Sequence, residues 1–253
     1  MKRLLIVLLI LISSISCFTL KAQNNVSFHR LGTHQGLSNS QVNCVFKDSK
    51  GYIWFGTQSG LDRFDGFRFK NFFYKYRDNL SLPNNAVDRI QEDINGNLWV
   101  HTAVGYCVYN SETENFKPNT NQLMETIGIH GSPNFVEIDS HKNMWIAVNG
   151  RGVYYNEVGK NKSFLFKQNG QGKSALPDGM VSCITECKDG VIITLNNGIL
   201  AKLSSKNHKV EWINKYLLTL HQGALMNHST YMDSYGNIWV SYLGNTVVWS
   251  SKS

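Results

Sequence analysis

The oxygen-bearing side chains best spaced to bind a metal in this 253-residue sequence lie in one short run. Asp93-Ile-Asn-Gly-Asn97 places carboxylate and amide groups at alternate positions, as the start of a calcium-binding loop does. No glutamate closes such a loop, because residues 98–106, with Thr102 and Ala103 among them, include none. We interpret the run as a hairpin turn, in which the aspartate accepts hydrogen bonds from turn amides and the glycine takes a positive φ.

Catalytic patterns are missing from the sequence. The eight histidines are dispersed, and neither a Gly-x-Ser-x-Gly elbow nor a phosphate-binding glycine-rich loop is present. His101 and Thr102 follow an apolar strand and are candidates to line a funnel mouth, although a structural histidine is the simpler interpretation. Paired carboxylates for glycoside hydrolysis would have to come from separate repeats, which one sequence does not test. We expect no catalytic residue, no cofactor and no metal.

Four cysteines follow position 23: Cys44, Cys107, Cys183 and Cys187. In an exported chain the last two are close enough in sequence to form a disulfide across a turn. Each cysteine lies in or at the end of an apolar strand, which favours the role of a small buried apolar residue. The paired Cys and His spacings of a zinc site are absent.

The Asp93 turn is one of five copies of a pattern that joins a turn to a short apolar strand, with a tryptophan in four copies. The positions that end the copies, 54, 99, 145, 193 and 239, are 45, 46, 48 and 46 residues apart. Ile193 replaces tryptophan in the fourth copy. We take the repeat to be structural, and its residues are Asp48, Gly51, Trp54, Asp93, Gly96, Trp99, Asp139, Trp145, Gly190, Asp233, Gly236 and Trp239.

A period of this length is typical of a four-stranded propeller blade when the local signals are β. In the first copy the expected strands are Gln41–Phe46, Tyr52–Thr57, Gly60–Phe64 and Phe67–Phe73, and no later stretch sustains a helical stripe. We therefore predict an all-β chain, with residues 24–253 forming a β-propeller of about five recognisable four-stranded blades, a partial one. The tryptophans are expected to fill the space between stacked blades.

The first 23 residues are expected to be a secretory signal peptide. Met1-Lys-Arg3 is basic and residues 4–15 are apolar. Leu20-Lys-Ala-Gln23 then provides a small residue near the polar end of the leader. Lipidation at Cys17 and an uncleaved anchor are weaker alternatives. The rest of the chain has 22 basic and 18 acidic residues, dispersed over turns, which indicates an ordinary surface and no nucleic-acid binding.

The segment from Gly36 to Gly66, GLSNSQVNCVFKDSKGYIWFGTQSGLDRFDG, resembles the opening repeat of the two-component regulator propeller family. That family comprises the periplasmic sensor domains of hybrid two-component histidine kinases of Gram-negative bacteria, and Val26–Leu31 is similar to their usual start. The resemblance implies a periplasmic location and a role in sensing for signal transduction through a phosphorelay. It also implies an N-terminal fragment, because the kinase, receiver and DNA-binding regions of the family have no counterpart here.

The resemblance further suggests an oligosaccharide ligand, with polar loops at Asn79–Asn85, Asn119–Asn134 and Asn169–Asp178. No ligand-binding residue is nominated. A protein-binding scaffold or a homodimerising module is the alternative, and a propeller-type hydrolase or lyase is a further one. Membrane attachment is expected only through the leader or the missing C-terminal region. If only five blades form, the chain either closes as a tighter ring or leaves two blade faces open and associates.

Overall fold

The structure is a computed structural model that describes residues 30–220 and 224–249. The chain divides into two units, residues 1–31 and 32–253, and the features below belong to the second. The predicted signal peptide, residues 1–23, lies outside the described residues and stays a prediction. Within the described ranges, the structure holds no helix long and apolar enough to cross a membrane.

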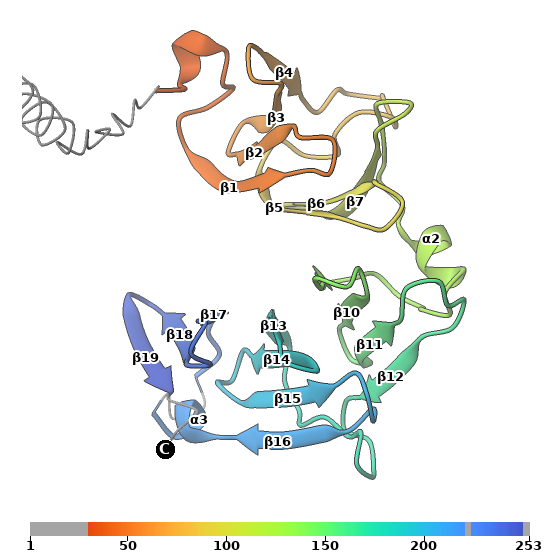
Figure 1. The fold of residues 1–253 in the computed structure, drawn as a ribbon, viewed down its shortest axis with the longest axis vertical. Helices are drawn as coiled ribbons and strands as arrows, with labels where there is room; N and C mark the ends of the chain where they lie inside the picture. Colours follow the sequence, from red (N-terminus) through yellow and green to blue (C-terminus); the bar gives the residue numbers. More distant parts are fainter. Residues whose placement is uncertain (1–29, 221–223, 250–253) are drawn as a thin grey trace, which may run out of the picture. The chain divides into compact units, whose positions relative to one another are not determined.

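The described residues fold into five antiparallel sheets that follow one another along the chain (Figure 1). We call them blades 1 to 5. Blade 1 consists of β1 (Val42–Lys47), β2 (Ile53–Thr57), β3 (Gly60–Phe64) and β4 (Phe69–Phe72). Blade 2 consists of β5 (Val87–Glu92), β6 (Leu98–Thr102), β7 (Gly105–Asn110) and β8 (Asn115–Lys117).

The remaining blades repeat this order of strands. Blade 3 consists of β9 (Phe135–Ile138), β10 (Met144–Val148), β11 (Gly152–Asn156) and β12 (Phe164–Lys167). Blade 4 consists of β13 (Val181–Cys187), β14 (Gly190–Leu195), β15 (Leu200–Ser204) and β16 (Val210–Asn214). Blade 5 has three described strands, β17 (Ser229–Met232), β18 (Ile238–Tyr242) and β19 (Asn245–Trp249). The predicted β-propeller blades are confirmed.

Three short helical segments lie in the connections, where none was expected. They are the 3-10 turn η1 (Thr33–Gln35), α2 (Asn121–Glu125) and α3 (Tyr216–Leu220). Each has at most five residues, which is too short for the i, i+3, i+4, i+7 pattern that identifies a helix in sequence. Met124 of α2 and Leu217 of α3 are buried, so these two helices close over the core between two blades, whereas η1 has no buried residue.

The core lies between consecutive blades. Trp54 packs with residues of blade 2, Trp99 with residues of blade 3, and Trp145 with residues of blade 4. The neighbours of each tryptophan on the strand face the preceding blade, as Leu98 and Val100 do in blade 2. Because each middle strand is covered on both faces, it reads as an apolar run and not as an alternation. Trp54, Trp99 and Trp145 therefore fill the spaces between blades, as expected.

Blade 4 departs from the predicted register by one residue. In the other blades the tryptophan pairs with the residue two before the turn aspartate, and in blade 4 the equivalent pair is Thr185 with Ile192. Ile193 instead packs with Trp145, on the face toward blade 3. The reason is a hairpin of only two residues, since Cys187 pairs directly with Gly190. Ile192, not Ile193, occupies the place of tryptophan, and Gly190 is a strand residue, not a turn glycine.

Candidate functional site

The repeated aspartate organises each first hairpin. In blade 1, Asp48 Oδ1 accepts hydrogen bonds from the backbone N–H groups of Lys50 and Tyr52 at 3.0 and 2.9 Å. Asp48 Oδ2 accepts the indole N–H of Trp54 at 2.7 Å. The corresponding tryptophan-to-aspartate distances are 3.2 Å to Asp93, 3.2 Å to Asp139 and 3.0 Å to Asp233. The carboxylates are occupied by turn donors, so Asp93 belongs to a hairpin, as the sequence indicated.

The place of the turn glycine requires a left-handed backbone. Gly51, Gly96 and Gly236 have φ values of 91°, 75° and 83°. Lys142 holds the same place in blade 3 with φ 66°, a conformation that costs free energy for a residue with a side chain. Its ammonium group reaches blade 2 and contacts Glu92, so a contact between blades accompanies the unfavourable turn.

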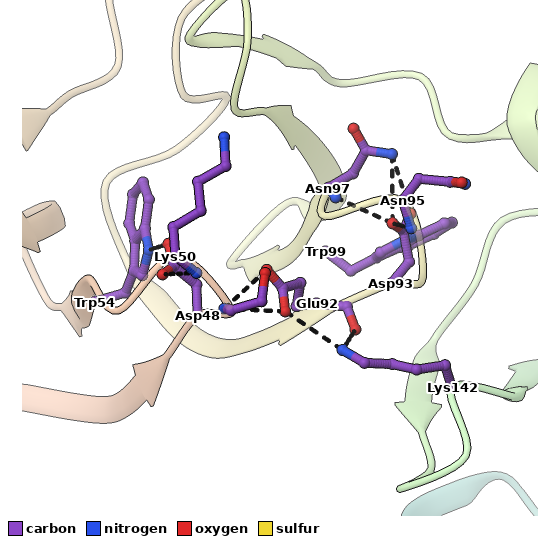
Figure 2. Close-up of polar contacts among 10 residues, drawn as sticks. Asp48, Lys50, Trp54, Glu92, Asp93, Asn95, Asn97, Trp99 and Lys142 are labelled. Carbon is purple, nitrogen blue, oxygen red and sulfur yellow. Dashed lines mark hydrogen bonds and ion pairs between the residues drawn. The ribbon is translucent and has the colours of Figure 1, made fainter.

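Glu92 joins the turns of three blades (Figure 2). Its carboxylate accepts the Ser49 backbone N–H at 3.1 and 3.2 Å and the Ser49 hydroxyl at 2.7 Å, from blade 1. Lys142 Nζ of blade 3 lies 3.3 Å from Glu92 Oε2 and 3.0 Å from the Glu92 carbonyl oxygen. The Glu92 residue is only 6% exposed, and a carboxylate is stable there because its oxygens have donors.

A second serine–glutamate pair links blades 3 and 4. Glu186 accepts the backbone N–H of Ser140 at 3.0 Å and its hydroxyl at 2.5 Å. Ser49 and Ser140 directly follow their turn aspartates, and Glu92 and Glu186 directly precede the next turn. The sequence prediction missed both pairs, because the partners are 43 and 46 residues apart. The serine directly after the turn aspartate is the sequence feature that could have indicated these pairs.

A row of polar residues lies in, or directly before, the first strand of each blade. Five residues before each turn aspartate, or before Cys187 in blade 4, a polar side chain recurs. The row consists of Asn43, Asp88, Asn134, Ser182 and His228. The amide of Asn43 donates to the Val87 carbonyl at 2.9 Å, and that of Asn134 donates to the Val181 carbonyl at 3.1 Å. Two members of the row thus bind the backbone of the following blade.

Asp88 holds the histidine that the sequence singled out. Asp88 Oδ1 lies 2.6 Å from His101 Nδ1, and the imidazole lies against the Tyr106 ring with centroids 4.6 Å apart. The Tyr106 hydroxyl accepts a hydrogen bond from the backbone N–H of Val136 at 2.9 Å. Burial raises the pKa of Tyr106 to about 12. His101 is therefore held in place by a carboxylate and an aromatic ring, which favours the structural interpretation, while Thr102 is buried and donates to the Gly105 carbonyl.

Glu137 on β9 is the most perturbed carboxyl of this region. Burial raises its pKa to about 7, against the opposing hydrogen bond from Gln91 and the charge of Arg89. Gln91 Nε2 donates to Glu137 Oε2 at 2.8 Å, and Arg89 Nη1 lies 3.9 Å from the same oxygen. The Arg89 guanidinium also lies 3.9 Å from the centre of the Phe135 ring. These contacts tie blade 2 to blade 3.

Two surface cavities flank the connection between β8 and β9. The first, of about 380 Å³, lies beside Tyr106, and we call it the Tyr106 cavity. The second, of about 320 Å³, we call the Gln122 cavity. Asn119 and Thr120 contribute to both. The Tyr106 cavity is lined by Val104, Gly105, Tyr106, Pro118, Asn119, Thr120, Asn121, Ser132 and Pro133, and the Gln122 cavity by Asn97, Val108, Asn110, Lys117, Asn119, Thr120, Gln122, Leu123 and Thr126.

Amide and hydroxyl side chains line both cavities beside aliphatic ones, and Tyr106 adds an aromatic wall to the Tyr106 cavity. Such a surface offers hydrogen-bond donors and acceptors to a neutral polar ligand, and it contains no nucleophile–base pair. The cavities coincide with the predicted polar loop Asn119–Asn134. No group of three metal-ligating side chains occurs in the described part of the chain. All four described cysteines are free.

Comparison with known proteins identifies the repeat. The family model described as two component regulator propeller matches residues 36–59 and 81–103, which contain the first two Asp–Trp hairpins. Blades 1 and 2 therefore contain sequences that match two-component regulator propeller repeats. This propeller is also 36% identical over 74 residues to histidine kinase P4 of Formosa agariphila, over 29% of this chain and 5% of that protein.

Solved structures extend the similarity to most of the propeller. The extracellular domain assigned to the hybrid two-component system BT3049 of B. thetaiotaomicron matches with a TM-score of 0.64 and 26% identity. That match covers 88% of this chain and 30% of the other. The extracellular domain of BT4673 from the same organism shares the fold, with a TM-score of 0.57, 21% identity, and coverage of 89% and 32%. This chain thus spans about a third or less of the length of these three relatives.

Proposed function

We propose that this propeller is the periplasmic, ligand-binding sensor region of a hybrid two-component system, and that it binds an oligosaccharide. The observation that supports the role is the 26% identity, over 88% of the chain, to the extracellular domain of such a system. The role that we propose for this chain is sensing. We propose neither a phosphoryl acceptor nor an ATP site among the described residues.

The Tyr106 and Gln122 cavities are the proposed ligand site. Sugars present hydroxyl groups along their edges and C–H groups on their faces, and both kinds of partner line these cavities. Gln122 and Ser132 are exposed, and their side chains are not engaged in the hydrogen bonds that build the blades. They are therefore free to contact a ligand without cost to the fold.

Titration calorimetry of the purified chain against a panel of neutral and acidic oligosaccharides tests the proposal. We expect one class of oligosaccharide to bind, and Gln122→Ala and Ser132→Ala to weaken binding about tenfold, the loss of one or two hydrogen bonds. Asn161→Ala, an exposed amide outside the cavities, is the matched control and is expected to bind normally. Binding that both cavity variants leave unchanged would place the ligand elsewhere, and cleavage of the sugar would favour the hydrolase alternative.

A further inference from the structure

Blade 5 presents its tryptophan on an uncovered face. Trp239 is 41% exposed, whereas Trp54, Trp99 and Trp145 are at most 1% exposed at the same place in their blades. Its cross-strand neighbours Tyr231 and Val248 are 65% and 46% exposed. Every other repeat tryptophan is covered by the following blade, so the chemistry of this face is that of a surface between blades.

The serine–glutamate pairs indicate which kind of blade fits such a face. Blades 1 and 3 carry a serine after the turn aspartate, and each is covered by a blade with a glutamate before its own turn. Blades 2 and 4 carry Ile94 and Lys188 at the serine place, and the blades that follow them carry Ile138 and Met232 at the glutamate place. In both cases the serine of one blade binds a glutamate of the next blade. The blades that follow Ile94 and Lys188 carry no glutamate at that place.

Blade 5 carries a serine again. Ser234 follows Asp233, and it is exposed beside the uncovered tryptophan. Its backbone N–H and hydroxyl are the donors that Ser49 and Ser140 use to bind a glutamate. We propose that the Trp239 face is a docking surface for a further blade of the same repeat, and that Ser234 selects a blade with a glutamate at the place of Glu92 and Glu186.

A second copy of this chain fits the face less well. The natural partner surface on a copy would be the first face of blade 1, whose residue at the glutamate place is Lys47. A lysine ammonium is a donor only, so the Ser234 donors would be buried against another donor. The hydrogen-bonding chemistry therefore favours a glutamate-bearing blade over self-association.

Strand pairing defines where such a blade can be joined for a test. Trp239 pairs with Val248 as Trp54 pairs with Arg63, so position 253 corresponds to position 68 of the first repeat. A second copy of residues 69–117, appended directly after Ser253, supplies an outer strand for blade 5 and then a copy of blade 2. The appended blade carries its own copy of Glu92.

Four proteins test the selection: the fusion, the fusion with Glu92→Leu in the appended copy, the fusion with Ser234→Ile, and the fusion with both changes. Hydroxyl-radical footprinting, read by mass spectrometry, measures the modification rate of Trp239, with the buried Trp145 as internal reference. We expect a fall of about tenfold in the Trp239 rate in the fusion relative to the unmodified chain, because the side chain becomes buried. Each single change should restore most of the original rate.

The double change should lower the rate again, because blades 2 and 3 pack together with aliphatic residues, Ile94 and Ile138, at these two places. Equal protection by the glutamate and leucine copies would overturn the role of Ser234. Protection of Trp239 in the unmodified chain that increases with protein concentration would overturn the choice of partner, since a second copy would then cover the face. Absence of protection in all four fusions would overturn the docking surface itself.

Discussion

At the scale of single residues, the turn aspartate combines two roles that are usually separate. One carboxylate oxygen caps the hairpin amides, and the other fixes the indole of a tryptophan that fills the space between blades. The sequence reveals both residues because they lie six positions apart in every copy that has them. It does not reveal the partners of Glu92 and Glu186, since those contacts depend on which blades become neighbours.

Trp145→Phe is expected to destabilise the protein more than Trp239→Phe. Both changes keep an aromatic ring and remove the indole N–H that binds the aspartate. Trp145 is fully buried, so the change leaves a small cavity and removes a buried hydrogen bond to Asp139, at a cost of about 2 kcal/mol, whereas water replaces the donor at Trp239. Urea unfolding of the two variants measures the difference, and equal losses would contradict the burial argument.

Glu92→Ala is expected to lower the free energy of unfolding by about 3 kcal/mol. The change leaves the Ser49 donors without an acceptor and leaves the Lys142 ammonium with only the backbone carbonyl of residue 92. Glu112→Ala, on the exposed turn between β7 and β8, is the matched control and should change stability by less than about 0.5 kcal/mol. Chemical denaturation compares the two, and similar small losses would show that the Glu92 contacts do not hold the blades together.

Glu137 should make stability depend on pH. Its pKa in the folded protein, about 7, is above its value in the unfolded chain, so the folded state binds this proton more tightly. Stability is therefore greatest below the unfolded pKa and is lost as the pH rises toward 7. The wild type should lose on the order of 2 kcal/mol relative to Glu137→Gln between pH 5 and pH 8.

Thermal or urea unfolding of both proteins across that range isolates Glu137, because the other titrating groups cancel in the difference. A difference that stays constant with pH would mean that the carboxyl is already ionised in the folded protein at pH 5.

At the scale of elements, the number of blades and the place of the second strand could be predicted from the sequence. The 45- to 48-residue spacing and the apolar run after each turn were sufficient for this. The register of blade 4 was not predicted correctly. Counting residues from the expected turn predicted Ile193 at the tryptophan place. In the structure the hairpin has only two residues, so strand pairing puts Ile192 there. Turn length cannot be read from a repeat whose aspartate is missing.

The two kinds of glycine in the repeat should respond differently to substitution. A Cβ atom on Gly190 would lie 1.9 Å from the Leu203 carbonyl oxygen, inside the sheet, whereas a Cβ atom on Gly51 meets nothing within 4 Å. Gly51→Ala therefore has only the cost of a positive φ, about 1 kcal/mol, and Gly190→Ala should cost more than about 3 kcal/mol because strands must separate. Expression yield and thermal unfolding distinguish them, and comparable stability would contradict the corrected register.

At the scale of the whole molecule, the proposed ligand site could be predicted only in part from the sequence. The polar loop Asn119–Asn134 was recognised, but the cavities on its two sides also require Asn97, Asn110 and Tyr106 from the blade strands. What the described residues do determine is the chemistry of the faces that blades present to one another.

The uncovered face of blade 5 gives the last prediction. The purified chain should bind a fluorescent dye specific for apolar surface, because Trp239, Tyr231 and Val248 are exposed together on one sheet. The double change Tyr231→Thr and Val248→Thr keeps strand propensity and should reduce dye fluorescence about twofold or more, with a small effect on the melting temperature.

Tyr76→Thr removes an equally exposed aromatic ring outside the sheets and is the matched control for that experiment. Light scattering on the same samples should give a monomer, since Lys47 and Ser234 do not form a favourable pair between copies. If the chain instead forms dimers, and the double change makes them dissociate, the face binds a second copy. The apolar contact then outweighs the unfavourable meeting of the Lys47 and Ser234 donors. If Tyr76→Thr lowers the dye fluorescence and the double change does not, the blade 5 face is already covered in solution.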